Sequence, residues 1–502
     1  TSKPEPVLAE FADTDAERYL RTMAERLRDV PGVEYVFHLD NGGNFFGKRE
    51  ETQFRKSFRK LARNVRDYTF AAAAEADGYR PCRRCRPEHS PQATGAADAP
   101  DLVCRALRVI SAGGLDVTST EHLARDLGVS DRHLRRLFHH HVGTSPDAVA
   151  RSRRAHLAKR LLDETTLPVA DIAFAAGFNS VRQMNRVVRS VFHRTPTELR
   201  AHAPRDPDAA GDGSLVLRLA GRPPLAIQPL FAFLGHRAVA GVESVSATSY
   251  RRTVTIDGAP GFIHLEAIPD SPDITLRALL PSYRSLSHVV DQARRLLDLD
   301  APIHAIDAQF RSDPILAASV RRQPGMRVPG VWDSFELAVR AILGQQVTVA
   351  AATTLADRLV EAHGTTVTTP DGKAHRVWPD AEQLAGVDPA TIGVPAARAA
   401  SVLTLSRAVA EGELVLDDRR SADEIVARLR SLPGIGPWTA SYIAMRALGD
   451  RDAHPSGDVA LRAALEGRGG RPSSAEVDRA FEAWRPWRAY AAVRLWHTRT
   501  SG

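Results

Sequence analysis

A glycine hairpin followed by one carboxylate is the part of the sequence best suited to chemistry. Residues 432–442 read LPGIGPWTASY, and Asp458 lies 22 residues beyond Gly436. Gly434 and Gly436 lack Cβ atoms, so the hairpin backbone can approach a partner closely. Pro437 suits the first position of the following helix, whose free N–H groups can receive a phosphate. The pattern predicts a helix–hairpin–helix that grips a nucleic-acid backbone without reading its sequence, with Asp458 as the candidate catalytic group.

Further motifs on both sides of the hairpin narrow its interpretation. Trp438 follows the hairpin, residues 341–347 read AILGQQV, and Trp487 and Trp496 lie near the C-terminus. Together with Asp458, these motifs resemble the AlkA-type 3-methyladenine DNA glycosylases, over about residues 214–502. The resemblance implies an enzyme of base-excision repair that flips alkylated purines out of double-stranded DNA and excises them.

The resemblance also implies a role for each matching residue. Breaking an N-glycosidic bond develops positive charge on the sugar, so a carboxylate is needed near C1′, where the resemblance places Asp458. Electron-rich rings suit a cationic alkylated base. The implied base pocket consists of Trp438, Tyr442, Trp496, Phe233 and Gln345, and the implied DNA contacts include Gln346, Gly434 and Gly436. The alternatives left open are that Asp458 caps the next helix and that the tryptophans belong to the core.

Two departures from related enzymes affect the expected reaction. Trp438 stands where bifunctional relatives carry a lysine, so we expect base removal by water and no lyase activity on abasic sites. Gln346 stands where the family has a leucine wedge, which puts the depth of its insertion into DNA in question. No cofactor is expected for catalysis, although the carbonyls of Arg430, Leu432 and Ile435 could hold a monovalent cation, as they do in the family.

The middle of the chain predicts two helix-turn-helix units. Residues 118–138 and 169–187 each read as helix, glycine turn and helix, and Ser130 is a suitable N-cap. The pattern resembles the AraC-type DNA-binding domain, in which polar side chains reach base edges in the major groove. The candidate DNA contacts are Arg132, His133, Arg136, Arg182, Gln183, Asn185 and Arg186, with an ordinary solvated face as the alternative.

Residues 64–85 resemble the second half of the Ada N-terminal domain, where four cysteines hold zinc. Cys82 and Cys85 supply half of such a site, but the two upstream cysteines of that family are missing here. Zinc therefore stays an open question, since only His38, Asp40 or His89 could complete the ligand set. Because the methyl-accepting cysteine is one of those missing, we expect no methyltransferase activity on DNA phosphotriesters.

Composition and linkers set the overall organisation. The 502 residues carry a net charge of +7, are 43% hydrophobic and include three cysteines, which favours a reducing, cytoplasmic location. No signal peptide or membrane-spanning run is recognisable, and we expect a monomer. Linker-like stretches at 90–100 and 204–213 suggest domains at 1–90, 100–203, 213–300 and 301–502.

The predicted fold is multidomain and mainly α. It comprises a degenerate Ada-like α/β domain, an all-α AraC-type double helix-turn-helix, an α+β subdomain with an antiparallel sheet, and an all-α helix–hairpin–helix glycosylase core. The competing function is a transcription regulator of the alkylation response that binds DNA without catalysis. Release of free base from alkylated DNA distinguishes the two.

Overall fold

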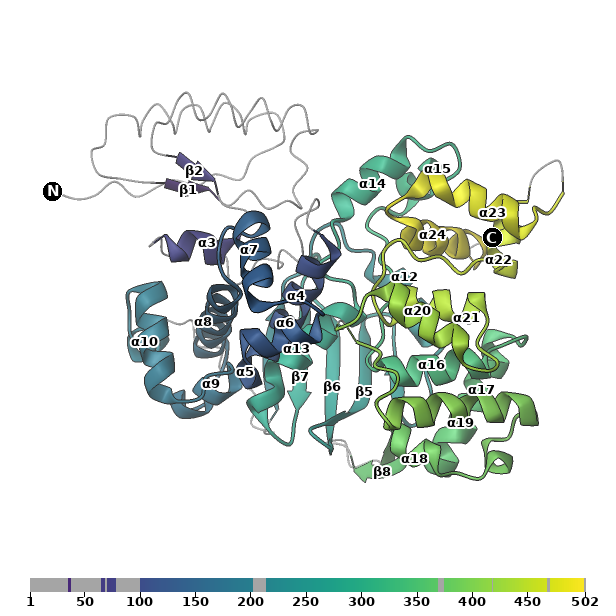
Figure 1. The fold of residues 1–502 in the computed structure, drawn as a ribbon, viewed down its shortest axis with the longest axis horizontal. Coiled ribbons are helices and arrows are strands. Elements are labelled where there is room, and N and C mark those ends of the chain that lie inside the picture. The colour runs from purple at the N-terminus through teal and green to yellow at the C-terminus, as the bar shows by residue number, and fades with distance from the viewer. Residues whose placement is uncertain are drawn as a thin grey trace.

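Figure 1 shows the computed structural model, which describes residues 35–37, 65–67, 70–77, 100–201, 214–368, 374–417, 419–466 and 470–500. The described chain is mainly helical and contains one five-stranded antiparallel sheet, in agreement with the predicted fold class. Within these residues, no helix combines the length and the apolar character needed to cross a membrane.

The described part of the N-terminal segment contains two short strands and one helix. Strand β1 (Tyr35–Phe37) pairs in parallel with β2 (Val65–Asp67), and helix α3 (Ala71–Ala76) follows. Helix α3 packs against α8 (Pro146–Glu164), where Glu75 Oε1 lies 2.6 Å from His156 Nε2. The Ada-like segment is thus joined to the helix-turn-helix region by a direct polar contact.

Both predicted helix-turn-helix units are present. Ser130 and Ser180 cap the second helix of each unit by accepting backbone N–H groups at 3.3 and 3.1 Å. The turn glycines Gly128 and Gly177 have φ of +76° and +85°, and residues that carry a Cβ rarely adopt such positive values. The helices of this region are α4 (Asp101–Ser111), α5 (Gly114–Val117), α6 (Thr120–Asp126), α7 (Asp131–His141), α8, α9 (Val169–Ala175), α10 (Val181–Phe192) and α11 (Pro196–Arg200).

The predicted antiparallel sheet follows, and it has the strand order β3-β7-β6-β5-β4. Its inward side chains alternate with outward ones, most regularly on β7, as a half-buried sheet requires. Helix α12 (Ile227–Gly235) connects β3 to β4, the next strand in sequence. The strands are β3 (Leu215–Leu219), β4 (Glu243–Val245), β5 (Ser249–Ile256), β6 (Ala259–Ala267) and β7 (Ile274–Leu279).

Among the described residues that follow β7, the regular structure is helical except for one two-stranded sheet, β8 (Thr365–Thr368) with β9 (Ala374–Val377), which the sequence pattern did not predict. A capping box at Ser421 opens the first helix of the hairpin, as predicted. The helices are η2 (Tyr283–Ser285), α13 (Leu286–Leu296), α14 (Ile303–Arg311), α15 (Ala317–Arg322), α16 (Ser334–Leu343), α17 (Val349–His363), α18 (Ala381–Ala385), η3 (Pro389–Ile392), α19 (Ala396–Ala410), α20 (Ala422–Ser431), α21 (Pro437–Arg446), α22 (Val459–Ala464), α23 (Ser474–Phe481), η4 (Glu482–Trp484) and α24 (Arg488–Thr500).

One apolar core runs from the helix-turn-helix region into the sheet. Leu161 of α8, Leu217 of β3 and Val289 of α13 are all buried in it. Polar contacts reinforce the junction, since Arg160 Nη2 donates to the carbonyl of Arg218 at 2.5 Å. In Figure 1 the sheet lies between α8–α10 on one side and α16–α21 on the other. The predicted domain limits stay a prediction, but regions separated by a linker in sequence share a core in space.

Candidate active site and DNA-binding face

Asp458 is the N-cap of α22, and three N–H groups hold its carboxylate. Its Oδ1 accepts from the backbone N–H of Leu461 at 2.9 Å. The indole of Trp438 donates to Oδ2 at 3.0 Å, and the indole of Trp496 donates to Oδ1 at 3.2 Å. The residue remains partly exposed. Asp458 therefore caps α22 and also presents a fixed carboxylate that a ligand can still reach.

Four rings, which we call the aromatic cluster, pack together beside this carboxylate. Trp438 and Tyr442 lie one turn apart on α21 and stack at 5.2 Å between centroids, only 7° from parallel. Tyr442 lies 6.3 Å from Trp496 of α24, and Trp496 stacks with Phe233 of α12 at 6.4 Å. All four are partly exposed. The structure thus brings together four of the five predicted base-pocket residues, from three segments far apart in sequence.

Gln345, the fifth predicted pocket residue, contacts the hairpin. Its Nε2 donates to the carbonyl of Gly434 at 2.8 Å and to the hydroxyl of Thr439 at 3.1 Å. The next residue, Gln346, is exposed and has φ of +59°, a conformation that is uncommon for a residue with a Cβ and that is often found at functional sites. The loop between α16 and α17 is therefore tied to the hairpin and presents Gln346 to solvent.

Two guanidinium groups lie on the aromatic cluster, and no sequence motif indicated either of them. Cζ of Arg237 lies 3.7 Å from the ring centroid of Phe233, and Cζ of Arg446 lies 4.9 Å from the same ring. Arg446 Nη1 also donates to the Tyr442 hydroxyl at 2.7 Å. Each arginine follows its aromatic partner by four residues, Arg446 within α21 and Arg237 in the turn after α12, and this spacing could have indicated both contacts.

These arginines change the acidity of the Tyr442 hydroxyl. Burial raises the pKa of Tyr442, but the charges of Arg446 and Arg237 and the hydrogen bond from Arg446 lower it by more. The pKa therefore lies below its ordinary value, and the hydroxyl is a stronger hydrogen-bond donor than an isolated phenol.

The hairpin between α20 and α21 has the predicted backbone. Gly434 has φ of +82°, and a Cβ added there would lie 1.9 Å from Oγ and 2.9 Å from Cβ of Ser401 on α19. Gly436 is the N-cap of α21, which begins with Pro437, and a Cβ on Gly436 would meet nothing within 4 Å. The two glycines therefore serve different purposes, because one allows close packing inside the protein and the other leaves open space outside it.

We expect Gly434→Ala to destabilise the hairpin and Gly436→Ala to leave it folded. The left-handed backbone and the overlap with Ser401 predict a loss of about 2–4 kcal/mol in unfolding free energy for Gly434→Ala. Gly436 has φ of −84°, so alanine there should cost less than about 1 kcal/mol while its methyl group weakens duplex binding. Urea unfolding and a duplex-binding titration of both variants test this, and equal destabilisation would contradict it.

The seven predicted contacts of the helix-turn-helix region lie on the second helix of each unit. Their apolar neighbours point inward, since Leu134, Phe138, Met184 and Val188 are all buried. The candidate residues are exposed or half-exposed: Arg132, His133 and Arg136 on α7, and Arg182, Gln183, Asn185 and Arg186 on α10. This orientation suits a recognition helix, and their contact with DNA remains a prediction.

The predicted half metal site, Cys82 and Cys85, lies outside the described residues. The same holds for His38, Asp40 and His89, the other candidate ligands. In the part of the chain that the structure describes, no group of three or more metal-binding side chains is present.

Comparison with known proteins accounts for all three parts of the chain. Residues 216–333 match the family described as the AlkA N-terminal domain, residues 123–202 match a helix-turn-helix domain family, and residues 55–88 match the metal binding domain of Ada. Over 441 residues the chain is 42% identical to the probable bifunctional transcriptional activator/DNA repair enzyme AlkA of Mycobacterium tuberculosis. That alignment covers 87% of this chain and 88% of the relative. The chain belongs to the AlkA family. The resemblance found in the sequence is thereby confirmed.

A second AlkA-type relative matches only the glycosylase part. DNA-3-methyladenine glycosylase 2 of Escherichia coli is 31% identical over 282 residues, which cover 55% of this chain and 95% of that protein. Among solved structures, the 3-methyladenine DNA-glycosylase from Archaeoglobus fulgidus matches 56% of this chain and 96% of its own, with 20% identity and a TM-score of 0.49.

Exposed apolar side chains are a further feature of the region around the AlkA-type site. Val347 and Val349, beside Gln346, are 39% and 43% exposed, and Val459, directly after Asp458, is 63% exposed. Large apolar side chains are commonly buried, so three exposed valines beside the hairpin loop and the carboxylate favour contact with a partner there.

Proposed function

We propose that this AlkA-family chain is a monofunctional DNA glycosylase that extrudes and excises alkylated purines of the 3-methyladenine and 7-methylguanine type. The observation that carries this proposal is the Asp458 carboxylate, held by two indole N–H groups beside the aromatic cluster. A fixed charge next to a ring-lined site is what cleavage of an N-glycosidic bond requires.

In the proposed reaction, the C1′–N9 bond breaks and its electron pair leaves with the base. The sugar becomes cationic, and Asp458 stabilises that charge without forming a bond. Water then adds to C1′ and releases one proton. A cationic methylated base departs as a neutral molecule, so it leaves more readily than a normal purine.

The aromatic cluster supplies the proposed recognition of the base. The faces of Trp438 and Trp496 can attract a positively charged ring system, which distinguishes an alkylated base from a normal purine. Gln346 and the neighbouring exposed valines would occupy the space that the extruded base leaves in the duplex. The hairpin glycines and the start of α21 would hold the phosphate backbone.

The helix-turn-helix region supports an attached DNA-reading function. Its two recognition helices present seven polar side chains outward, and such helices read base edges in the major groove. The alternative function is therefore a transcription regulator of the alkylation response without catalysis. Binding of alkylated duplex without release of base would favour that alternative.

Base release with an intact DNA strand is the result we expect from the wild-type protein. Imine formation at C1′ needs an amine, but Trp438 occupies the corresponding position, and no lysine lies between Lys373 and the C-terminus. Chromatography should detect free methylated base, and the strand should break only after alkali treatment. An unmodified duplex is the control, and stoichiometric borohydride trapping of a protein–DNA adduct would overturn the monofunctional mechanism.

Catalysis is proposed to need no cofactor, and two ion sites remain proposals. The last carbonyls of a helix lack intrahelical partners, so those of Arg430 and Leu432, with that of Ile435, could hold a monovalent cation that attracts a phosphate. The match of residues 55–88 to the metal binding domain of Ada, together with Cys82 and Cys85, supports a zinc site near the N-terminus. The proposed location is the cytoplasm, because the substrate is cellular DNA.

A further inference from the structure

The Tyr442 hydroxyl is held from one side by a guanidinium whose own position is fixed. Arg446 is buried at 5% exposure and donates to the carbonyls of Pro329 and Gly330 at 2.8 and 2.9 Å. A third hydrogen bond runs from Nη1 to the Tyr442 oxygen at 2.7 Å. The two carbonyls and the Tyr442 oxygen therefore fix the orientation of the Arg446 guanidinium. Arg446 in turn occupies one lone pair of the Tyr442 oxygen.

A second guanidinium, that of Arg237, reaches the same region from the turn that follows α12. Arg237 Nη1 donates to the carbonyl of Phe233 at 3.1 Å. Burial lowers the pKa of Arg237 by more than the charge of Tyr442 and a hydrogen bond donated to Tyr442 raise it. The backbone carbonyl of Arg237 in turn accepts a hydrogen bond from Arg340.

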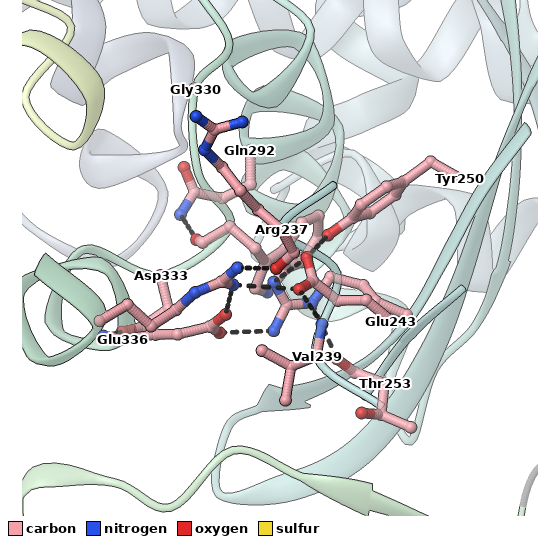
Figure 2. Close-up of polar contacts among 12 residues, drawn as sticks. Arg237, Val239, Glu243, Tyr250, Thr253, Gln292, Gly330, Asp333 and Glu336 are labelled. Carbon is pink, nitrogen blue, oxygen red and sulfur yellow. Dashed lines mark hydrogen bonds and ion pairs between the residues drawn. The ribbon is translucent and has the colours of Figure 1, made fainter. Parts of the chain in front are cut away.

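A buried ion-pair network holds Arg340 in place. Figure 2 shows the polar contacts around Glu243, Glu336 and Arg237. Arg340 Nη1 lies 3.0 Å from Glu243 and 2.8 Å from Glu336, and Glu336 also pairs with Arg252 at 2.6 Å. Breaking a buried pair of this kind is costly, so the backbone at Arg237, in the turn after α12, is rigidly placed. Both arginines beside Tyr442 are therefore built into the fold.

This arrangement fixes the direction of the Tyr442 hydroxyl. Arginine has donors and no acceptor, so Tyr442 accepts from Arg446 and cannot give its own hydrogen to either guanidinium. Among the described residues, no acceptor for that hydrogen is present, and the side chain is only partly exposed within the aromatic cluster. A half-buried donor that no protein group satisfies is available to a ligand that supplies the acceptor.

We propose that the Tyr442 hydroxyl is a specificity-determining hydrogen-bond donor to the extruded base, oriented by Arg446 as a positioning residue, and that it serves neutral purine lesions. This inference rests on the proposed glycosylase function. A neutral deaminated purine such as hypoxanthine has ring nitrogens and a carbonyl oxygen that accept hydrogen bonds. A cationic methylated purine has lost one such acceptor to the alkyl group.

The same donor aids departure of a neutral base. When the C1′–N9 bond breaks, its electron pair makes a neutral purine anionic, and the hydrogen bond from Tyr442 stabilises that charge while the hydroxyl keeps its proton. The proton released by the attacking water neutralises the free base. A cationic purine leaves as a neutral molecule, so it gains little from the donor. The two guanidiniums near the hydroxyl also disfavour a positively charged ring at this end of the site.

The test compares two substrates on one variant. Tyr442→Phe keeps the ring that stacks on Trp438 and removes only the hydroxyl. Single-turnover excision of hypoxanthine from a defined duplex should fall about tenfold more than excision of 7-methylguanine does, the loss of one hydrogen bond to a developing charge. Arg446→Met should shift the ratio of the two rates in the same direction. The ratio is insensitive to the folded fraction, so a structural defect alone would not move it.

The possible failures can be told apart. Equal losses on both substrates, or a larger loss on 7-methylguanine, would overturn the inference while leaving the glycosylase function in place. Release of 7-methylguanine but no hypoxanthine by the wild-type protein would also overturn it. Release of neither base by the wild-type protein would overturn both the inference and the proposed function.

Discussion

Asp458→Asn is expected to abolish base release while duplex binding stays nearly unchanged. The asparagine has almost the same shape, and its carbonyl oxygen can still accept from Leu461 and cap α22. It lacks the negative charge that stabilises the sugar cation. Loss of such an electrostatic contact costs about 3–4 kcal/mol, so excision of 7-methylguanine should fall 100-fold or more. Single-turnover kinetics at saturating protein measures the effect.

A second capping aspartate provides the matched control for this change. Asp380 caps α18 through an N–H bond from Gln383 at 2.8 Å, and it forms a capping box outside the aromatic cluster. Asp380→Asn removes one carboxylate and keeps one cap, so its excision rate should stay within about twofold of wild type. If Asp458→Asn retained activity within a few-fold of wild type, Asp458 would not be the catalytic group.

The hairpin and the catalytic candidate were predictable because each depends on a short-range pattern. Gly434 and Pro437 have backbone requirements that hold whatever surrounds them, and Asp458 is a suitable cap for the helix that follows it. The resemblance then related Trp438 and Trp496 to this pattern. The resemblance did not predict that both indoles donate to Asp458. Hydrogen bonds between residues 20 and 38 positions apart depend on tertiary packing.

The sequence could not show which arginines belong to the site, for a similar reason. The chain contains many arginines, and an arginine is normally expected at the surface. Arg446 is buried because the carbonyls of Pro329 and Gly330, more than 100 residues away, accept its hydrogen bonds. Its spacing from Tyr442 is a weak signal, since the same spacing occurs wherever helices carry arginine.

The two-stranded sheet β8–β9 was missed because its stability is not local. Its strands are short and mostly polar, and neither shows a strong alternating pattern. Tertiary bonds hold it in place, with the hydroxyl of Thr253 donating to the carbonyl of Arg376 at 2.6 Å and the N–H of Arg376 donating to Gly241 at 2.9 Å. The periodicity of apolar residues in a sequence does not reveal such tertiary partners.

The packing of the helix-turn-helix region against the sheet could not be predicted from the sequence either. Residues 204–213 have the composition of a linker, which suggests independent neighbours. Helix α8 instead contributes buried side chains to the same core as β3 and α13. Because its partners come from separate segments, no single stretch of sequence reveals that this helix is central.

Trp438 should be the next most sensitive position, and two substitutions separate its two contributions. Trp438→Phe keeps a ring to stack on Tyr442 but removes the N–H that donates to Asp458 at 3.0 Å. Hydrogen bonds to charged groups contribute about 1.5–3 kcal/mol, so excision should fall about 10-fold to 100-fold. Trp438→Ala also loses the stacking face, and its activity should fall further, because base–aromatic stacking contributes about 1–3 kcal/mol.

The substrate pattern makes the Trp438 prediction specific. Asp458 acts on the sugar, which becomes cationic with every base, so Trp438→Phe should slow hypoxanthine and 7-methylguanine excision alike, unlike Tyr442→Phe. Trp378→Phe is the matched control, since the indole N–H of the buried Trp378 has no hydrogen-bond partner among the described residues. Its excision rates should equal those of wild type. If Trp438→Phe matched this control, the indole would not hold the carboxylate, and Trp438 would act through its aromatic face alone.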